Sequence, residues 1–558
     1  MIGPRHGVAA GHYLAAAAAH TVLENGGNAI DAGCAAGIAL GVLLPDLVNV
    51  AGVAPILIRR ADGRIESIAG LGHWPAALPA DFFLRECGGS IPEGVRRTVV
   101  PAAPDAWITA LERHGTWRFE DVVSFAIRYA REGFAVHPLL RESILTHRAA
   151  YERWESNRAI FLPGGRVPEI GERFVQADLA RTLQYMADEA RAAGHRGGRE
   201  AGLAAAHAAF YRGDIAAAIV AHQQAEGGFL SREDLAGFRS PIEPVLRRPW
   251  RGHEVITCGP WCQGPALLEA LLIAEAAGIA HLAHNSAEYL HVLIEAIKCA
   301  MADREAFFGD PAFVDVPLDR LLSEEHIRAR ARGIGRIAHP GMPEPLLGRL
   351  AEPRESSRAL PAIEADTSYC AVVDRWGNAF SATPSDGSWN SPVTPGLGIV
   401  PSNRGSQSRP DPRHPAGVAP RKRPRLTPNP AMLITAEGGV MPFGTPGGDV
   451  QIQAMLQVLL NILQFGMELG EAIAAPRIAS YAFPSSFAPF EYFPRRVAIE
   501  SRIEPRVRSD LAARGHEVQL WPEMTWLAGA VEVVMQRPRH GLVAAAADLR
   551  RPAGAMAG

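Results

Sequence analysis

The residue pattern changes near position 361, and this change constrains the fold more than any single motif does. Before it, residues 101–240 are rich in Ala, Arg and Glu and predict a mostly helical stretch. From Thr367 onward, short apolar runs alternate with Gly, Pro and Asn, which is typical of strands joined by turns. Helices first, and then strands with covering helices, predict a mixed layered architecture.

Turn residues divide the chain into expected elements. Residues 11–44 predict two Ala-rich helices separated at Gly26-Gly27-Asn28, because glycine commonly follows the end of a helix. A polar, Gly-rich loop is expected near residues 194–199. The other expected elements are a hairpin over 54–68, a hairpin over 367–383, a long loop over 397–421, a helix over 451–465 and a hairpin over 530–546.

The bulk properties argue against several classes of protein. The formal net charge is −3, whereas a nucleic-acid binder carries a clustered basic excess, and the one basic run, residues 421–425, lies in a proline-rich loop. The longest apolar run, residues 32–44, is shorter than the roughly 18 residues that cross a membrane. Cys258 and Cys262 do not have the spacing of a zinc or redox motif, so free thiols in a reducing compartment are expected. The sequence predicts no nucleic-acid or membrane partner, no metal and no cofactor.

Thr367 is a candidate nucleophile, provided that the chain is cut directly before it. A threonine hydroxyl needs an adjacent base, and an N-terminal threonine has its own α-amine, with a pKa of about 7.7–8.0 in peptides. In the uncut chain, the Thr367 hydroxyl would attack the carbonyl of Asp366, and water would open the resulting ester. Taken by itself, Thr367 is better explained as a β-branched residue at the start of a strand.

Gly447 and Gly448 are candidate donors to an oxyanion. Their two backbone N–H groups precede the helix expected from Gln451, and glycine permits close approach and unusual dihedral angles. Taken by itself, the pair is better explained as a strand-to-helix turn.

Sequence blocks along nearly the whole chain, in the same order as in a known family, favour the catalytic explanation of Thr367, Gly447 and Gly448 over the structural one. Asp366-Thr367-Ser368-Tyr369 and residues 372–378 resemble the start of the small subunit of γ-glutamyltranspeptidases, and so does the loop that contains Gly447 and Gly448. The other matching blocks are Glu24-Asn25-Gly26-Gly27-Asn28-Ala29-Ile30-Asp31-Ala32, His284-Asn285-Ser286-Ala287-Glu288-Tyr289, Ala302-Asp303-Arg304, Lys422-Arg423-Pro424, Phe465-Gly466-Met467 and Ala475-Pro476-Arg477.

The resemblance implies an α+β fold, namely the four-layer αββα sandwich of N-terminal-nucleophile hydrolases, with one large core built from two chains. It implies self-cleavage before Thr367 into a large subunit (residues 1–366) and a small subunit (residues 367–558), which remain together as a heterodimer. The match begins within the first ten residues and leaves little room for a signal peptide. This favours the cytoplasm, with the periplasm as the alternative.

The resemblance also assigns roles to residues. Thr367 becomes the nucleophile and its amine the base, while Gly447 and Gly448 form the oxyanion hole. The family's supporting hydroxyl, about eighteen residues after the nucleophile, falls on Ser385, with Thr383 as the weaker candidate.

The chain departs from the family where classical members hold the γ-glutamyl group. Residues 70–75 lack the arginine of that clamp, Gln407 stands where an aspartate is expected, and Leu426-Thr427 replaces a serine pair. Losing the carboxylate removes the partner of an α-ammonium group, and an unpaired buried ion is costly. Arg404 is either a new partner for a substrate carboxylate or a solvated loop arginine.

These departures predict an acylase that hydrolyses a glutaryl-type amide, such as glutaryl-7-aminocephalosporanic acid, and retains some γ-glutamyltranspeptidase activity. The alternatives are an ordinary γ-glutamyltransferase that acts on glutathione and a hydrolase of another small amide. From another class, the chain could be an uncleaved binding relative without catalysis.

Overall fold

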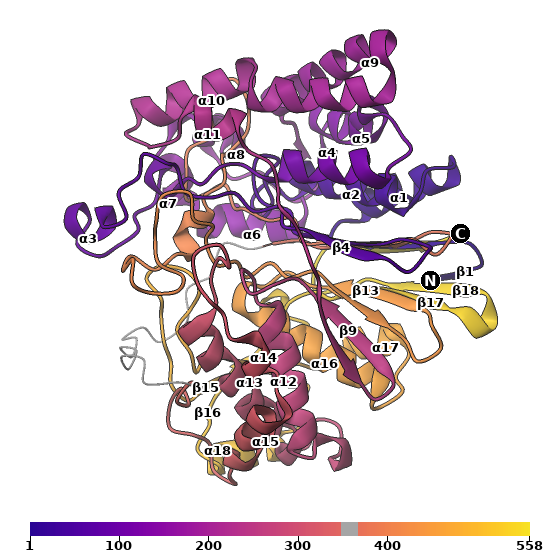
Figure 1. Cartoon of the computed structure of the whole chain (residues 1–558), viewed down its shortest axis with the longest axis vertical. Helices are drawn as coiled ribbons and strands as arrows, with labels where there is room; N and C mark the ends of the chain where they lie inside the picture. The colour runs from indigo at the N-terminus through magenta and orange to yellow at the C-terminus, as the bar shows by residue number, and fades with distance from the viewer. Residues whose placement is uncertain (347–366) are drawn as a thin grey trace.

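Two seven-stranded sheets lie face to face between two layers of helices in the computed structural model, which describes residues 1–346 and 367–558 (Figure 1). The predicted four-layer α+β sandwich is confirmed. Asp366, the predicted cleavage residue, lies outside the described residues. The first sheet has the order β1 (Ile2–Gly3), β18 (Leu542–Ala546), β17 (Glu532–Arg537), β13 (Val440–Gly444), β12 (Ala431–Ile434), β9 (His253–Thr257) and β8 (Leu246–Trp250).

The second sheet contains the strand that leads away from Thr367. Its order is β19 (Gly554–Ala557), β2 (Gly7–Ala10), β10 (Cys370–Val373), β11 (Ala379–Ala382), β3 (Ile56–Arg59), β4 (Ile65–Ile68) and β7 (Ile242–Glu243), and every neighbouring pair is antiparallel. Strands from both sides of residues 347–366 therefore pair with one another within one sheet. In the register of β10, Cys370 lies opposite both Ala10 and Ala382.

Helices cover the outer face of each sheet (Figure 1). Over the second sheet lie α1 (Tyr13–Glu24), α2 (Ala29–Leu43), α4 (Ala103–His114), α5 (Phe119–Glu132) and α9 (Ala177–Tyr211). On the side of the first sheet lie α12 (Gly264–Ala276), α13 (Ala287–Phe307), α15 (Glu324–Gly333), α16 (Gln451–Leu463) and α17 (Leu469–Ala474). The remaining α-helices of the described residues are α3 (Phe82–Glu86), α6 (Pro138–Thr146), α7 (Arg148–Glu152), α8 (Glu155–Phe161), α10 (Asp214–Ala225), α11 (Arg232–Ala236), α14 (Leu318–Leu321) and α18 (Pro505–Ala513).

Small side chains explain how α2 lies so close to the second sheet. The helix is buried along its whole length, and a Cβ atom on Gly33 would lie 2.1 Å from the ring of Phe380 in β11. Asn28 caps its first turn in a capping box with Asp31. The predicted helix pair over residues 11–44 is therefore confirmed, and it supports the hairpin that follows Thr367.

The loop expected over residues 194–199 is wrong in its length. These residues lie inside α9, but two helical segments of α9 meet there at a kink, because Gly198 has the non-helical φ of 79°. β5 (Phe134–Ala135) and β6 (Arg173–Phe174) form a separate pair, and β14 (Ile478–Ser480), β15 (Arg496–Glu500) and β16 (Glu517–Trp521) form a third sheet. Within the two described stretches, no helix combines the length and apolarity needed to span a bilayer.

Candidate active site

Thr367 lies just before β10, buried with 1% of its surface exposed. It pairs with Ser385 in an antiparallel bridge, and their hydroxyl oxygens are 2.9 Å apart. The backbone N–H of Ser368 donates to the carbonyl of Pro384 at 2.9 Å and fixes this pairing. The hairpin therefore brings Ser385, eighteen residues along the chain, to the predicted nucleophile. Thr383 instead uses its backbone N–H to bind the carbonyl of Pro55.

Two further side chains contact Thr367, and neither was identified from the sequence. Gln451, the first residue of α16, donates to the Thr367 hydroxyl at 3.4 Å. Arg551 donates to the carbonyl oxygen of Thr367, also at 3.4 Å. Only the position of Gln451 directly after the glycine loop could have indicated a role. Arg551, at the far end of the chain, carries no such signal.

The glycine loop connects β13 to α16. Gly447 has a φ of 124° and Gly448 a φ of 55°, values that favour glycine. The N-terminal end of a helix carries a partial positive charge, so backbone N–H groups here suit an oxyanion. Because Gln451 contacts the Thr367 hydroxyl, the loop and the predicted nucleophile belong to one site.

Asp449, which follows Gly448, links the glycine loop to two residues that precede residues 347–366, namely Gln263 and Arg304. Its carboxylate accepts hydrogen bonds from Gln263 at 2.5 Å and from Arg304 at 2.7 Å. The backbone N–H and the hydroxyl of Ser486 add two more bonds, each 2.7 Å long. Arg304 is fully buried, so this ion pair is screened little by solvent.

Arg404 contacts Ser385, the residue predicted to supply the supporting hydroxyl. Its guanidinium donates to the Ser385 hydroxyl, and its Nε atom is 3.4 Å from the Asp386 carboxylate. The ring of Phe487 lies 5.6 Å from the guanidinium carbon. Burial raises the pKa of Asp386, and the charge of Arg404 opposes that rise. The interpretation of Arg404 as a solvated loop arginine is wrong, because its side chain is fully buried.

The side chains of Gln407 and Thr427, two predicted substrate-binding residues, contact each other. The Gln407 side-chain amide donates to the Thr427 hydroxyl at 2.9 Å, and the Thr427 backbone N–H approaches the amide oxygen at 3.4 Å. Trp74, from the stretch that lacks the family's arginine, is buried and donates from Nε1 to the Ser408 hydroxyl at 3.0 Å. Gln407 therefore bonds to an uncharged hydroxyl, and the stretch without the arginine places an indole in the interior.

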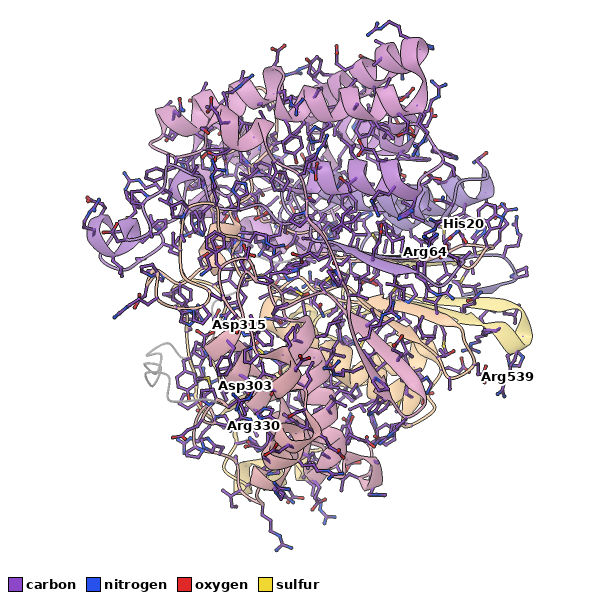
Figure 2. The ribbon with its side chains drawn as sticks, viewed as in Figure 1. His20, Arg64, Asp303, Asp315, Arg330 and Arg539 are labelled. Carbon is purple, nitrogen blue, oxygen red and sulfur yellow. The ribbon has the colours of Figure 1, made fainter. Side chains whose placement is uncertain are left out.

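Clusters of His and acidic side chains elsewhere already have a cationic partner. In the lower helical layer, Arg330 donates from Nε to Asp303 at 3.1 Å (Figure 2). The clusters with ligand atoms within 4.8 Å of one another are Glu269, Asp303 and His326; His291, Glu295 and His516; and His6, His20 and Glu24. Lys298 and Arg5 likewise donate to the acids of the second and third clusters, at 2.9 and 2.7 Å. We therefore assign none of them to a metal.

Two facing sheets between helical layers are the fold of N-terminal-nucleophile hydrolases, and the chain has this fold. The sequence profile described as Gamma-glutamyltranspeptidase matches residues 15–558. The chain therefore belongs to the γ-glutamyltranspeptidase family and is an enzyme of its hydrolase and acyltransferase class.

Named relatives and one solved structure agree with this assignment. The chain is 32% identical over 482 residues to the glutathione hydrolase-like YwrD proenzyme of Bacillus subtilis (strain 168), covering 86% of this chain and 85% of the relative. It is 31% identical over 560 residues to the Acylase ACY 1 proenzyme of Pseudomonas sp. (strain V22), covering 98% and 92%. The structure of the cephalosporin acylase from Bacillus halodurans superposes with a TM-score of 0.85 at 29% identity, over 100% of this chain and 96% of that one.

Proposed function

We propose that this enzyme is a self-processing acylase that hydrolyses glutaryl-type amides, such as glutaryl-7-aminocephalosporanic acid, with some γ-glutamyltranspeptidase activity. One observation carries the choice of acyl group, namely the uncharged pair of Gln407 and Thr427. The α-ammonium of a γ-glutamyl group would find no carboxylate to pair with at position 407, and an unpaired buried cation is costly. A glutaryl group avoids that cost because it has a terminal carboxylate and no amine. We assign Arg404 as the partner of that carboxylate.

The first reaction is cleavage of the chain before Thr367. The Thr367 hydroxyl attacks the carbonyl carbon of Asp366, the peptide nitrogen takes up a proton, and water then hydrolyses the ester. The hydroxyl of Ser385, 2.9 Å away, supports this by binding the attacking oxygen. The products are a large subunit (residues 1–366) and a small subunit (residues 367–558). The relatives' names, which call them proenzymes, agree with such processing.

The second reaction is acyl transfer at the same hydroxyl. The freed α-amine of Thr367 takes the hydroxyl proton as the oxygen attacks the amide of the substrate. The backbone N–H groups of Gly447 and Gly448 stabilise the oxyanion, and the proton passes to the departing amine. Water then releases the acid from the Thr367 ester.

The decisive comparison is kcat/KM for glutaryl-p-nitroanilide against γ-glutamyl-p-nitroanilide. We expect a preference for the glutaryl substrate, and a strong γ-glutamyl preference would reject the acylase assignment. Intact mass and N-terminal sequencing, beside Thr367→Ala, test the processing step. Two chains with the smaller one starting at Thr367, and an uncut variant, are expected. A wild-type chain that stays whole would remove Thr367 as the nucleophile.

The second candidate is glutathione hydrolysis or γ-glutamyl transfer, and the names of several relatives favour it. Transfer to glycylglycine at a rate comparable to hydrolysis would identify it. The cysteines are free thiols, which fits a reducing compartment and supports a cytoplasmic location.

A further inference from the structure

Gln451 contacts the hydroxyl of the proposed nucleophile from the first turn of α16. Its side chain is fully buried, and its Nε2 atom lies 3.4 Å from the Thr367 hydroxyl oxygen. At the other end of the same amide, Oε1 accepts a hydrogen bond from the backbone N–H of Asn429 at 3.2 Å. A backbone N–H only donates, so the end that faces Asn429 is the oxygen and the end that faces Thr367 is the NH2 group. The Thr367 oxygen therefore accepts a hydrogen bond from Gln451.

The group that holds this amide is rigid. Asn429 lies between Pro428 and Pro430, and the ring of a proline fixes the φ angle of that residue. The side chain of Asn429 is also held, because its oxygen accepts a hydrogen bond from the Cys262 thiol at 3.4 Å. Both Asn429 and Cys262 are fully buried, so water does not compete for these bonds. The Gln451 amide therefore has one fixed orientation toward Thr367.

Two other buried glutamines of α16 show the pattern of a structural role. Gln457 donates to the carbonyl of Ile478 at 3.0 Å and accepts from its N–H at 2.9 Å, as a neighbouring strand would. Gln453 makes the same pair of bonds with Ser480, at 3.1 and 2.7 Å. These two amides attach α16 to the backbone of β14. Gln451 differs because one of its partners is the hydroxyl assigned to the reaction.

We propose that Gln451 is a catalytic residue that stabilises negative charge on the Thr367 oxygen. This inference rests on the proposed function, in which Thr367 is the nucleophile. A bond of 3.4 Å to a neutral hydroxyl is long, whereas hydrogen bonds to a charged oxygen are shorter and about twice as strong. The bond therefore strengthens as charge develops on the oxygen. An interaction that is stronger in the transition state than in the ground state lowers the barrier.

Charge develops on this oxygen in both halves of the reaction. In acylation, the hydroxyl proton passes to the α-amine of Thr367 while the oxygen forms its bond to the acyl carbon. In deacylation, the α-amine takes a proton from water, and the water oxygen bonds to the acyl carbon. The bond from that carbon to the Thr367 oxygen then breaks, the electron pair stays on the Thr367 oxygen, and the ammonium returns the proton. Self-cleavage uses the same oxygen when it attacks the Asp366 carbonyl.

This role is separate from the role of the glycine loop. The loop's N–H groups are assigned to the carbonyl oxygen of the acyl group, whereas Gln451 acts on the oxygen that attacks and later leaves. Ser385 contacts that same oxygen at 2.9 Å and itself accepts a bond from Arg404. Arg404 occupies one lone pair of the Ser385 hydroxyl, so the hydroxyl proton is available for Thr367. Gln451 and Ser385 therefore act as two donors to one oxygen.

Two substitutions test the NH2 group of Gln451. Gln451→Glu keeps an oxygen for the Asn429 N–H but loses the NH2 group, and Gln451→Met fills similar space and loses both bonds. One oxyanion donor is worth about 10²–10³ in kcat, and Ser385 remains as a second donor, so we expect kcat to fall by at least about tenfold. KM should change little because both half-reactions slow together. Self-cleavage, followed by intact mass over time, should slow by a similar factor.

Gln457→Leu is the matched control, since it removes a buried glutamine of the same helix that bonds to the backbone of β14. It should cleave itself and turn over at wild-type rates even where its melting temperature falls. Wild-type rates in Gln451→Glu would overturn the inference. An equal loss of kcat in Gln457→Leu would also overturn it, because the effect would then be structural. Gln451→Glu decides the question if Gln451→Met does not fold.

Two substrates separate this inference from the proposed function. Gln451 acts on the Thr367 oxygen and not on the acyl group, so kcat for glutaryl-p-nitroanilide and γ-glutamyl-p-nitroanilide should fall by the same factor. A γ-glutamyl preference of the wild type with this equal loss would reject the acylase assignment and retain the role of Gln451. A glutaryl preference with unchanged rates in both Gln451 variants would retain the proposed function and reject the role of Gln451.

Discussion

Replacing Arg304 by Gln removes the cation that holds Asp449 beside the glycine loop. Arg304 and Asp449 form a buried pair at 2.7 Å, and removal of one partner from such a pair costs about 3–5 kcal/mol. Asp449 keeps its hydrogen bonds from Gln263 and Ser486, so we expect the lower end of that range, about 3 kcal/mol of unfolding free energy. The carboxylate left behind would also carry an unbalanced negative charge close to the oxyanion.

The kinetic consequence separates positioning from substrate binding. One oxyanion donor is worth about 10²–10³ in kcat, and a displaced loop weakens two donors. We therefore expect Arg304→Gln to lower kcat by at least about tenfold with little change in KM, measured on glutaryl-p-nitroanilide after processing is confirmed by mass. Asp449→Asn, which keeps the shape of the side chain, serves as the control for charge. Unchanged kcat and an unchanged denaturation midpoint in Arg304→Gln would refute the claim that Arg304 positions the glycine loop through Asp449.

Three further perturbations follow from the described contacts. Ser385→Ala removes the hydroxyl 2.9 Å from that of Thr367 and should slow both self-cleavage and turnover about tenfold or more, as followed by the appearance of two chains on a gel. Gly447→Ala places a side chain at a φ of 124° and should lower kcat about 100-fold while the protein still folds, as shown by circular dichroism. Burial, and then the charge of Asp548, raise the pKa of Glu532 well above its usual range. Because the folded state then holds a proton that the unfolded chain loses above pH of about 4.3, stability should fall as pH rises beyond that point. Glu532→Gln should melt higher than wild type at pH 8 and equally at pH 4, and equal melting at both values would contradict this.

Local sequence patterns predicted the parts of the fold and site that depend on neighbouring residues. The hairpin after Thr367 brings Ser385 into contact because the chain reverses once between them, and turn residues mark that reversal. The positive φ values of Gly447 and Gly448 follow from the same kind of local signal. The helix pair that packs on the second sheet was also recognisable, because two Ala-rich runs are separated at Gly26-Gly27-Asn28.

Contacts between distant segments could not be predicted in this way. Arg304 reaches Asp449 across 145 residues, and Arg551 reaches Thr367 across 184. No periodic pattern links such positions, since only the packing of both sheets brings them together. The error at residues 194–199 has a related cause. That stretch is polar because much of it faces solvent, but the helix continues to the kink at Gly198, where the chain folds back so that Gly202 lies close to Ala190.

Residues 1–346 and residues 367–558 both contribute strands to each of the two large sheets. β2 lies between β10 and β19, and β9 pairs with β12, so each sheet draws strands from both sides of residues 347–366. Separating the two portions would break the hydrogen bonds between neighbouring strands in both sheets and leave backbone N–H and C=O groups unpaired. When both portions belong to one chain, each is present at a high effective concentration for the other while the sheets form. A cut made after folding would therefore release the α-amine of Thr367 without releasing either half. If the two portions were expressed separately, they would have to associate before either sheet could form completely.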